Sequence, residues 1–210
     1  MAYCTQTDIE NYLQVGIDSS LDSQVSAWIA SVTAWINRYT DRNFEATAAV
    51  RKYDGKGRDY LIVDDLLSVS AIWFVSHDST SHANSESQTV TDFLLYQNDD
   101  PNKTPYNKLV VSPFSSSRLV FPLGVQNIWV NGSFGYTAAV PDDIKMVAVK
   151  LVASIIKVGK DDGISQYTEA DLSVSFTSFD KLLSTDLSVK EILDWYKKKT
   201  RFTGFNAIRT

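Results

Sequence analysis

The chain has 210 residues, of which 44% are hydrophobic, 21% charged and 12% aromatic, and its formal net charge is −5. This length suits one domain, or one domain with a sizeable insertion, and the ordinary composition excludes wholesale disorder, collagen and coiled-coil rods. An acidic chain is a poor candidate for binding nucleic acid over its whole surface, because phosphate binding needs clustered Lys and Arg. The single cysteine, Cys4, excludes intramolecular disulfides and multi-cysteine metal sites.

The N-terminal third predicts two helices. Thr7 and Glu10 have the spacing of a capping box, and the helix that they open is expected to end near Gly16. A second helix is expected from about Ser20 to between Thr40 and Asn43. Its apolar residues fall on one arc of about 120°: Leu21, Val25, Trp28, Ile29, Val32, Trp35, Ile36 and Tyr39.

The middle of the chain changes to the alternation typical of strands. Val50 to Tyr53 and Tyr60 to Val63 flank a glycine turn and predict a hairpin. Ser76 to Asp92, rich in Ser and Thr, predicts a long polar loop. Further strands are expected at Ser68 to Val75, Phe93 to Tyr96, Lys108 to Val111, Arg118 to Phe121 and Val125 to Phe134.

The C-terminal third returns to helices. Pro141 suits the first turn of a helix that is expected to run to Val158 and end at Gly159. This helix is apolar on most sides, so it should be the centre of a bundle or be covered by another subunit. It is interrupted by lysines and is too short to span a bilayer. A short strand or arm at 170–176 and a helix at 188–199, opened by a Ser188–Glu191 capping box, complete the layout.

These elements predict an α+β fold. A small bundle, made of the two N-terminal helices and the helices near 141–158 and 188–199, carries a β-rich insertion. The predicted domains are a helical core of residues 1–47 and 138–210 and an insertion of residues 48–137. No secretory signal is visible at the start of the chain, so we expect a soluble protein made in a reducing cytoplasm, without membrane contact.

No residue set in the chain supports catalysis. His77 and His82 fit no metal motif, and residues 54–59 lack the spacing of a phosphate or calcium loop. Adjacent acids such as Asp64 and Asp65 are not placed for opposed acid–base chemistry. No nucleophile elbow or dinucleotide fingerprint is present. We therefore expect no catalytic residue, no cofactor and no metal, and a protein that is not an enzyme.

The distribution of charge points to the C-terminus as an interaction segment. Residues 181–210 hold seven basic and three acidic residues, which leaves 13 basic and 22 acidic residues in 1–180. The basic cluster has two interpretations. Its charges can interact favourably with the helix dipole at the end of the last helix, or they can dock on an acidic partner or the next subunit. With nearby aromatic side chains it makes a candidate partner interface: Trp195, Lys197, Lys198, Lys199, Arg201, Phe202 and Phe205.

The order of elements resembles the head–tail connector (adaptor, or head completion) proteins of tailed bacteriophages. Three stretches carry the likeness: Thr7 to Leu13 with the helix ending Ile36 to Thr40, then Tyr53 to Gly57 leading into Leu61 to Val63 and Val69 to Ile72, and finally Gly135-Tyr136 followed by Val140 to Val149. Together they cover about two thirds of the chain. The sequence departs from the family pattern at Asp65-Leu66-Leu67, where a proline is expected, and from about Ile164 onward.

The resemblance implies a structural role. Such proteins are similar in forming homododecameric rings that bind the portal after DNA packaging and present a platform for a stopper or tail-terminator protein. It implies a homo-oligomer at the virion neck, assembled in the host cytoplasm, through which DNA passes non-specifically. The alternative is a phage tail or baseplate component, or a carbohydrate- or receptor-binding module, with Trp73, Tyr96, Tyr106 and Trp129 lining a glycan site.

Overall fold

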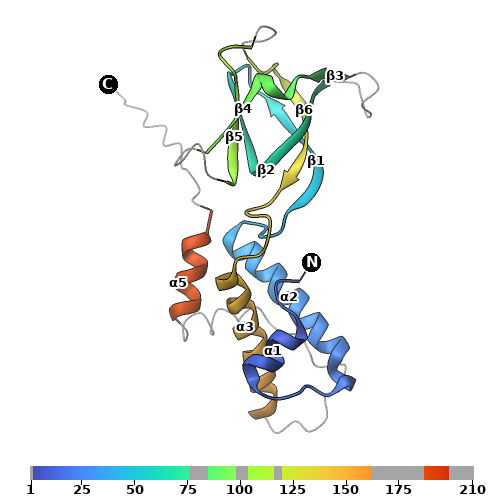
Figure 1. Ribbon diagram of the computed structural model, residues 1–210, viewed down its shortest axis with the longest axis vertical. Coiled ribbons are helices and arrows are strands. Elements are labelled where there is room, and N and C mark those ends of the chain that lie inside the picture. The colour runs from blue at the N-terminus through green and yellow to red at the C-terminus, as the bar shows by residue number, and fades with distance from the viewer. Residues whose placement is uncertain (1, 76–84, 98–103, 116–119, 162–186, 199–210) are drawn as a thin grey trace, which may run out of the picture. The chain divides into compact units, whose positions relative to one another are not determined.

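A computed structural model of the chain describes residues 2–75, 85–97, 104–115, 120–161 and 187–198. Within them, four α-helices and six antiparallel strands confirm the predicted α+β fold (Figure 1). The chain divides into two compact units. Unit 1 comprises Met1–Arg42 with Asp142–Thr210, and unit 2 comprises Asn43–Pro141. Folding of the predicted 48–137 insertion as a domain of its own stays a prediction.

Unit 1 begins with helix α1, Gln6–Leu13, which is capped two residues earlier than predicted. The Thr5 hydroxyl accepts from the Asp8 N–H at 3.2 Å, and Asp8 Oδ2 accepts from the Thr5 N–H at 2.8 Å. Thr7 therefore lies inside the helix, and the predicted Thr7–Glu10 box is wrong. The pair Thr5–Asp8 has the same spacing and satisfies the N–H groups of Thr5 and Asp8 in the same way. The helix also ends early, at a left-handed Gln14, rather than at glycine.

Helix α2, Asp22–Thr40, follows a short 3-10 turn at Ser19–Leu21 and confirms the second predicted helix. Six of its eight predicted apolar positions are buried, while Leu21 and Tyr39 are half-buried. Asp41 adopts a left-handed conformation and ends the helix. The amphipathic pattern thus identifies the buried face of α2 correctly.

Helix α3, Asp142–Asp161, contacts α1, α2 and α5, so it is covered by the rest of the bundle in unit 1. It passes through Gly159 and continues three residues beyond the predicted end at Val158. Its cover by three other helices explains why so little of it is polar. The buried residues of α3 are Ile144, Val147, Ala148, Val149, Leu151, Val152 and Ala153.

An ion pair joins α1 to α3. Lys145 Nζ lies 3.0 Å from Asp8 Oδ1. Desolvation alone would raise the pKa of Asp8, but hydrogen bonds from Thr5 and the charge of Lys145 outweigh it and lower that pKa. The ion pair therefore adds stability above the ordinary carboxylate range, and the stability is lost as the pH falls through the lowered pKa.

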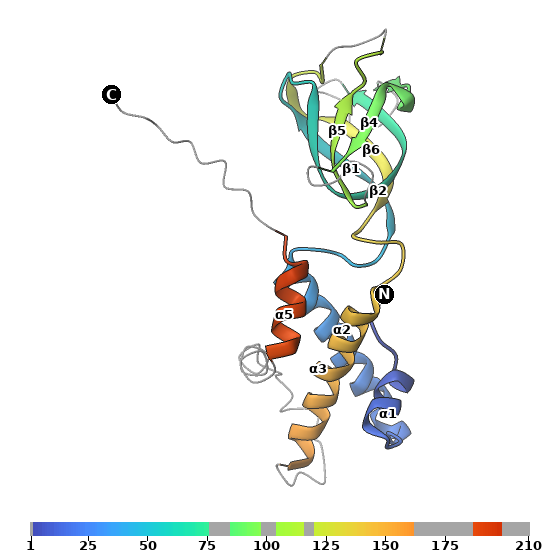
Figure 2. The same cartoon turned by 60° about the vertical axis from the view of Figure 1, so that its left-hand side comes forward.

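Unit 2 is one antiparallel sheet with the order β1-β6-β2-β5-β4, and β3 pairs with β2 (Figures 1 and 2). Its strands are β1 Thr47–Gly55, β2 Tyr60–Val75, β3 Ser85–Gln88, β4 Phe93–Tyr96, β5 Tyr106–Val111 and β6 Gly124–Phe134. The predicted hairpin between β1 and β2 is wrong, because β6 lies between them and pairs with both. The glycine turn reverses the chain direction between β1 and β2, but both strands pair with β6 rather than with each other.

Strand β2 joins two predicted strands into one. Register shifts between Ile62 and Leu66, and again between Leu66 and Ala71, interrupt its pairing. The strand can therefore pair with β5 in its first half and with β6 in its second.

The loop predicted at 76–92 contains β3, and its residues 76–84 lie outside the described part of the chain. The predicted arm at 170–176 and residues 118 and 119 of a predicted strand also lie outside it. Val120 and Phe121 are irregular rather than a strand.

One face of the sheet holds the apolar core of unit 2. The buried members of this core are Leu61, Val63, Leu66, Ile72, Phe74, Phe93, Leu109, Val111, Phe121, Ile128, Val130 and Phe134. Phe93 and Phe121 stack with their ring centroids 5.3 Å apart, and Phe74 meets both edge-on. The aromatic rings thus join segments that are distant in sequence.

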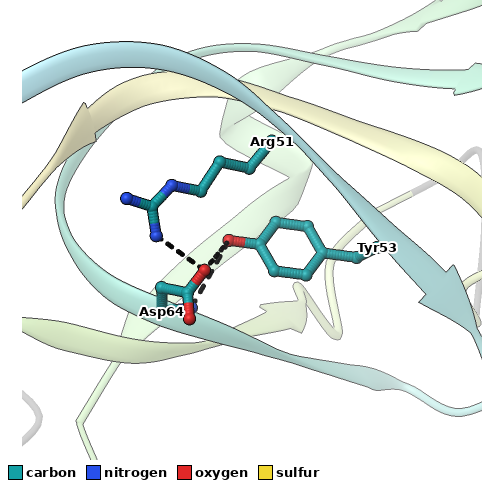
Figure 3. Close-up of polar contacts among 3 residues, drawn as sticks. All are labelled: Arg51, Tyr53 and Asp64. Atoms are coloured by element: carbon teal, nitrogen blue, oxygen red, sulfur yellow. Dashed lines mark hydrogen bonds and ion pairs between the residues drawn. The ribbon is translucent and has the colours of Figure 1, made fainter. Parts of the chain in front are cut away.

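A polar cluster joins β1 to the first half of β2 (Figure 3). Arg51 Nη1 lies 2.6 Å from Asp64 Oδ2, and the Tyr53 hydroxyl donates to the same oxygen at 3.2 Å. The Arg51 guanidinium also lies over the Phe134 ring, 4.3 Å from its centroid. These contacts tie together two strands that share no ladder hydrogen bonds.

The two chain segments at the start and end of unit 2 meet at Gly135. The Gly135 N–H donates to the Asp65 carbonyl at 2.8 Å, and the Tyr136 N–H donates to the Asn43 carbonyl at 2.7 Å. Gly135 has a φ of 150°, and a Cβ there would lie 2.4 Å from the Glu45 carbonyl oxygen. Both the backbone angle and the close approach therefore require glycine at this position.

We expect Gly135→Ala to lower the free energy of unfolding by about 2 kcal/mol or more, because the methyl group meets backbone and the angle is strained. Gly16→Ala is the matched control, since nothing lies within 4 Å of its added Cβ. Urea unfolding followed by circular dichroism measures both. Equal stabilities of the two variants would contradict the proposed requirement for glycine.

Candidate assembly interface

Helix α5, Leu187–Tyr196, carries the first of the predicted interface residues. Its buried face consists of Val189, Leu193 and Tyr196, which recur at helical spacing. Ser188 lies within the helix and accepts from Lys150 Nζ at 3.3 Å, so it is not the predicted cap. The helix ends at Tyr196, before the predicted end at residue 199.

The C-terminal end of α5 is fixed to α3 and α2 by hydrogen bonds. The Tyr196 hydroxyl donates to both carboxylate oxygens of Asp143, at 2.8 and 3.0 Å. The Tyr196 carbonyl accepts from Arg42 Nε at 2.6 Å, and the Lys198 N–H donates to the Thr40 carbonyl at 2.8 Å. The outward face of α5 therefore has a fixed place on unit 1.

Trp195 lies on that outward face with 72% of its surface exposed. Its ring meets Tyr196 edge-on, with the ring centroids 4.7 Å apart. Leu187, the first residue of the same helix, has 66% of its surface exposed. A large exposed aromatic on a well-anchored helix is the kind of side chain that acts as an interface anchor.

The basic residues divide into two groups. The ammonium of Lys197 lies 4.9 Å from the centre of the Tyr39 ring, and the backbone N–H of Lys198 donates to the Thr40 carbonyl. These two lysines therefore have contacts within their own chain. Four of the predicted interface residues lie outside the described part of the chain: Lys199, Arg201, Phe202 and Phe205. A common interface of all seven stays a prediction.

A second exposed surface lies on the outer face of β2, β5 and β4, and sequence reasoning missed it. The register pairs Tyr60 with Val110 and Val110 with Leu94, and it pairs Ile62 with Lys108 and Lys108 with Tyr96. Directly paired residues share a face. We call these six residues the sheet patch: Tyr60, Ile62, Leu94, Tyr96, Lys108 and Val110. Its signal in the sequence is that β2 and β4 are apolar at successive positions, not only at alternate ones.

The aromatic residues of the proposed glycan site do not gather on one exposed surface. Trp129 is only 4% exposed, with the Lys52 ammonium 4.1 Å from its ring centre, and Trp73 is its neighbour across β2 and β6. Tyr106 packs against the core, whereas Tyr96 belongs to the sheet patch. Because Trp129 is buried and Tyr106 packs against the core, the four side chains do not form one exposed site.

The described residues also offer little reactive chemistry. They contain no group of three His, Cys, Asp or Glu side chains that could hold a metal ion. No helix among them is long and apolar enough to cross a membrane. Burial, followed by the charge of Asp8, raises the pKa of Cys4 to about 11, so its thiol stays protonated at neutral pH. Burial and Asp64 likewise raise the pKa of Tyr53. His77 and His82 lie outside the described residues.

The two faces of α5 predict losses of stability of different size on substitution. Leu193→Ala should lower the free energy of unfolding by about 2–5 kcal/mol, because it leaves a cavity between helices. Trp195→Ala should cost about 1 kcal/mol or less, since it loses only an edge contact with Tyr196. Thermal or urea unfolding of the two variants measures this. A Trp195→Ala variant as unstable as Leu193→Ala would show that the indole belongs to the core.

Comparisons with known proteins give the fold a context. No protein-family model matches the chain, and neither does any curated protein sequence. Three solved chains cover 94% of this chain and 90–91% of their own length. They come from the neck of an empty gene transfer agent particle with C6 symmetry (TM-score 0.60, 10% identity), the virion of a native gene transfer agent particle (0.55, 10%), and the neck of the native particle with C12 symmetry (0.54, 12%). This chain therefore shares the fold of chains from gene transfer agent particles, two of them from the neck.

Proposed function

We propose that this chain is a structural protein of a virion neck, and that its copies form a ring joining the portal to the tail or stopper. The observation that carries the proposal is the likeness, over nearly the whole of both chains, to a chain of a gene transfer agent neck. The likeness includes both units, so the β-rich insertion is part of the shared architecture.

The symmetry of those particles supports a closed ring. Two of the similar chains belong to necks with C6 or C12 symmetry. A cyclic ring of identical subunits needs two different, complementary surfaces on each subunit. This chain exposes two surfaces of different character, the outward face of α5 and the sheet patch. The proposed assembly is a dodecamer that forms in the host cytoplasm.

Charge supports the passage of DNA through such a ring. Residues 1–180 carry a net charge of −9, from 13 basic and 22 acidic residues. Like charge repels the phosphates, so DNA would slide past an acidic wall without binding to it. The portal on one side and a stopper or tail-terminator protein on the other would be the protein partners, and the work would be done by surfaces rather than by a reactive site.

The direct test is assembly on the portal protein of the same particle. The purified chain, mixed with that portal, should give a complex whose mass corresponds to a closed ring of this chain per portal ring. Mass photometry and negative-stain electron microscopy measure this. If neither the chain alone nor the mixture forms any ring, the proposed function is wrong.

Truncation tests the C-terminal segment separately. Removing residues 199–210 leaves Lys198 and its bond to Thr40 in place, so the fold should be retained. We expect portal binding to weaken at least tenfold, because this truncation removes Arg201, Phe202 and Phe205. Removing 197–210 should in addition lower the melting temperature. Portal binding that survives the shorter truncation unchanged would mean that residues 199–210 do not contribute to portal binding.

A further inference from the structure

The sheet patch is an apolar surface with a positive centre. Ile62 is 68% exposed and Leu94 is 49% exposed, while Tyr60 and Val110 are half-buried. These residues face away from the core of unit 2, because Leu61, Leu109 and Leu95 occupy the alternate positions of the same three strands. Exposed apolar residues that are grouped in this way mark interaction surfaces.

The positive charge in the sheet patch is held in place by aromatic rings. Lys108 Nζ lies 4.2 Å from the centre of the Tyr60 ring and 5.7 Å from that of Tyr96. The Arg58 guanidinium lies 5.5 Å from the Tyr60 ring and bonds its hydroxyl. A partner for this surface should therefore combine apolar side chains with a negative charge between them.

The outward face of α5 has that pattern. Leu187, Glu191 and Trp195 recur every four residues, so they form one stripe, which we call the α5 stripe. All three are exposed, with the carboxylate between two large apolar side chains. Eight residues of helix extend about 12 Å. Three adjacent strands span about 10 Å. The two surfaces thus match in size as well as in charge.

We propose that the α5 stripe of one copy docks on the sheet patch of the next copy, with Glu191 paired to Lys108. The inference rests on the proposed function, since head-to-tail contacts between two different surfaces are what closes a ring. It names the surfaces that the proposed ring would use between its own subunits, and it leaves the segment after Lys198 for the portal.

Charge reversal tests the pairing. Lys108→Glu and Glu191→Lys should each weaken ring formation on the portal at least tenfold, because each places like charges together. The double variant should recover most of the wild-type assembly. Lys56→Glu, an equal change at an exposed lysine of the β1–β2 turn outside the sheet patch, is the matched control and should assemble normally.

Cross-linking tests the contact without relying on affinity. Two proteins are prepared in a Cys4→Ala background, one with Lys108→Cys and one with Glu191→Cys, and their equimolar mixture is treated with a short bismaleimide, with and without portal. We expect a covalent dimer from the mixture and little from either protein alone, as judged by denaturing gel electrophoresis. Because the two thiols are on different chains, only an intermolecular contact can give this product.

The outcomes separate the inference from the proposed function. If wild-type rings form, but the charge variants assemble normally and no mixed dimer appears, this contact is wrong and the neck role stands. If wild-type protein forms no ring with portal and no mixed dimer appears, both are wrong. A mixed dimer with charge-swap rescue supports the contact.

Discussion

Unit 1 depends on covering α3, a helix that is apolar around most of its circumference. Seven of its residues between Ile144 and Ala153 are buried, and each large one contributes about 1.5–3 kcal/mol when it leaves water. The polar residues at its N-terminal end then position the neighbouring helices: Lys145 binds Asp8 of α1, and Asp143 binds Tyr196 of α5. The outward face of α5, including Trp195, is therefore fixed by the same helix that forms the core.

Much of this architecture is predictable from the sequence, and the failures have local causes. Helix α2 follows from its periodicity, because one of its faces is apolar. The strands β4 and β6 follow from short apolar runs bounded by turn residues. The β1–β2 hairpin was predicted wrongly because a turn signal such as Asp54–Gly57 reports that the chain reverses, not which strand pairs with it. Likewise, Thr5 and Thr7 both begin capping-box spacings. The burial of Ile9 and the ion pair between Asp8 and Lys145 of α3 favour the first.

The candidate interface was predictable only in part, for a physical reason. Trp195 lies off the apolar stripe of its helix, so its exposure can be inferred from the helical period. The sheet patch cannot be found in this way, because a strand that is apolar on both faces has the same pattern whether its second face is covered by its own chain or by a partner. Only the register of β2, β5 and β4 brings Ile62, Leu94 and Lys108 together.

We propose that this protein acts through two different surfaces on a fold that it shares with chains of gene transfer agent necks. Cryo-electron microscopy of this chain bound to its portal tests the proposed closed ring of identical subunits most directly. We expect cyclic density on the portal axis, with each subunit's α5 against the β2–β5–β4 face of its neighbour. Single subunits scattered on the portal, or no bound density at all, would contradict it.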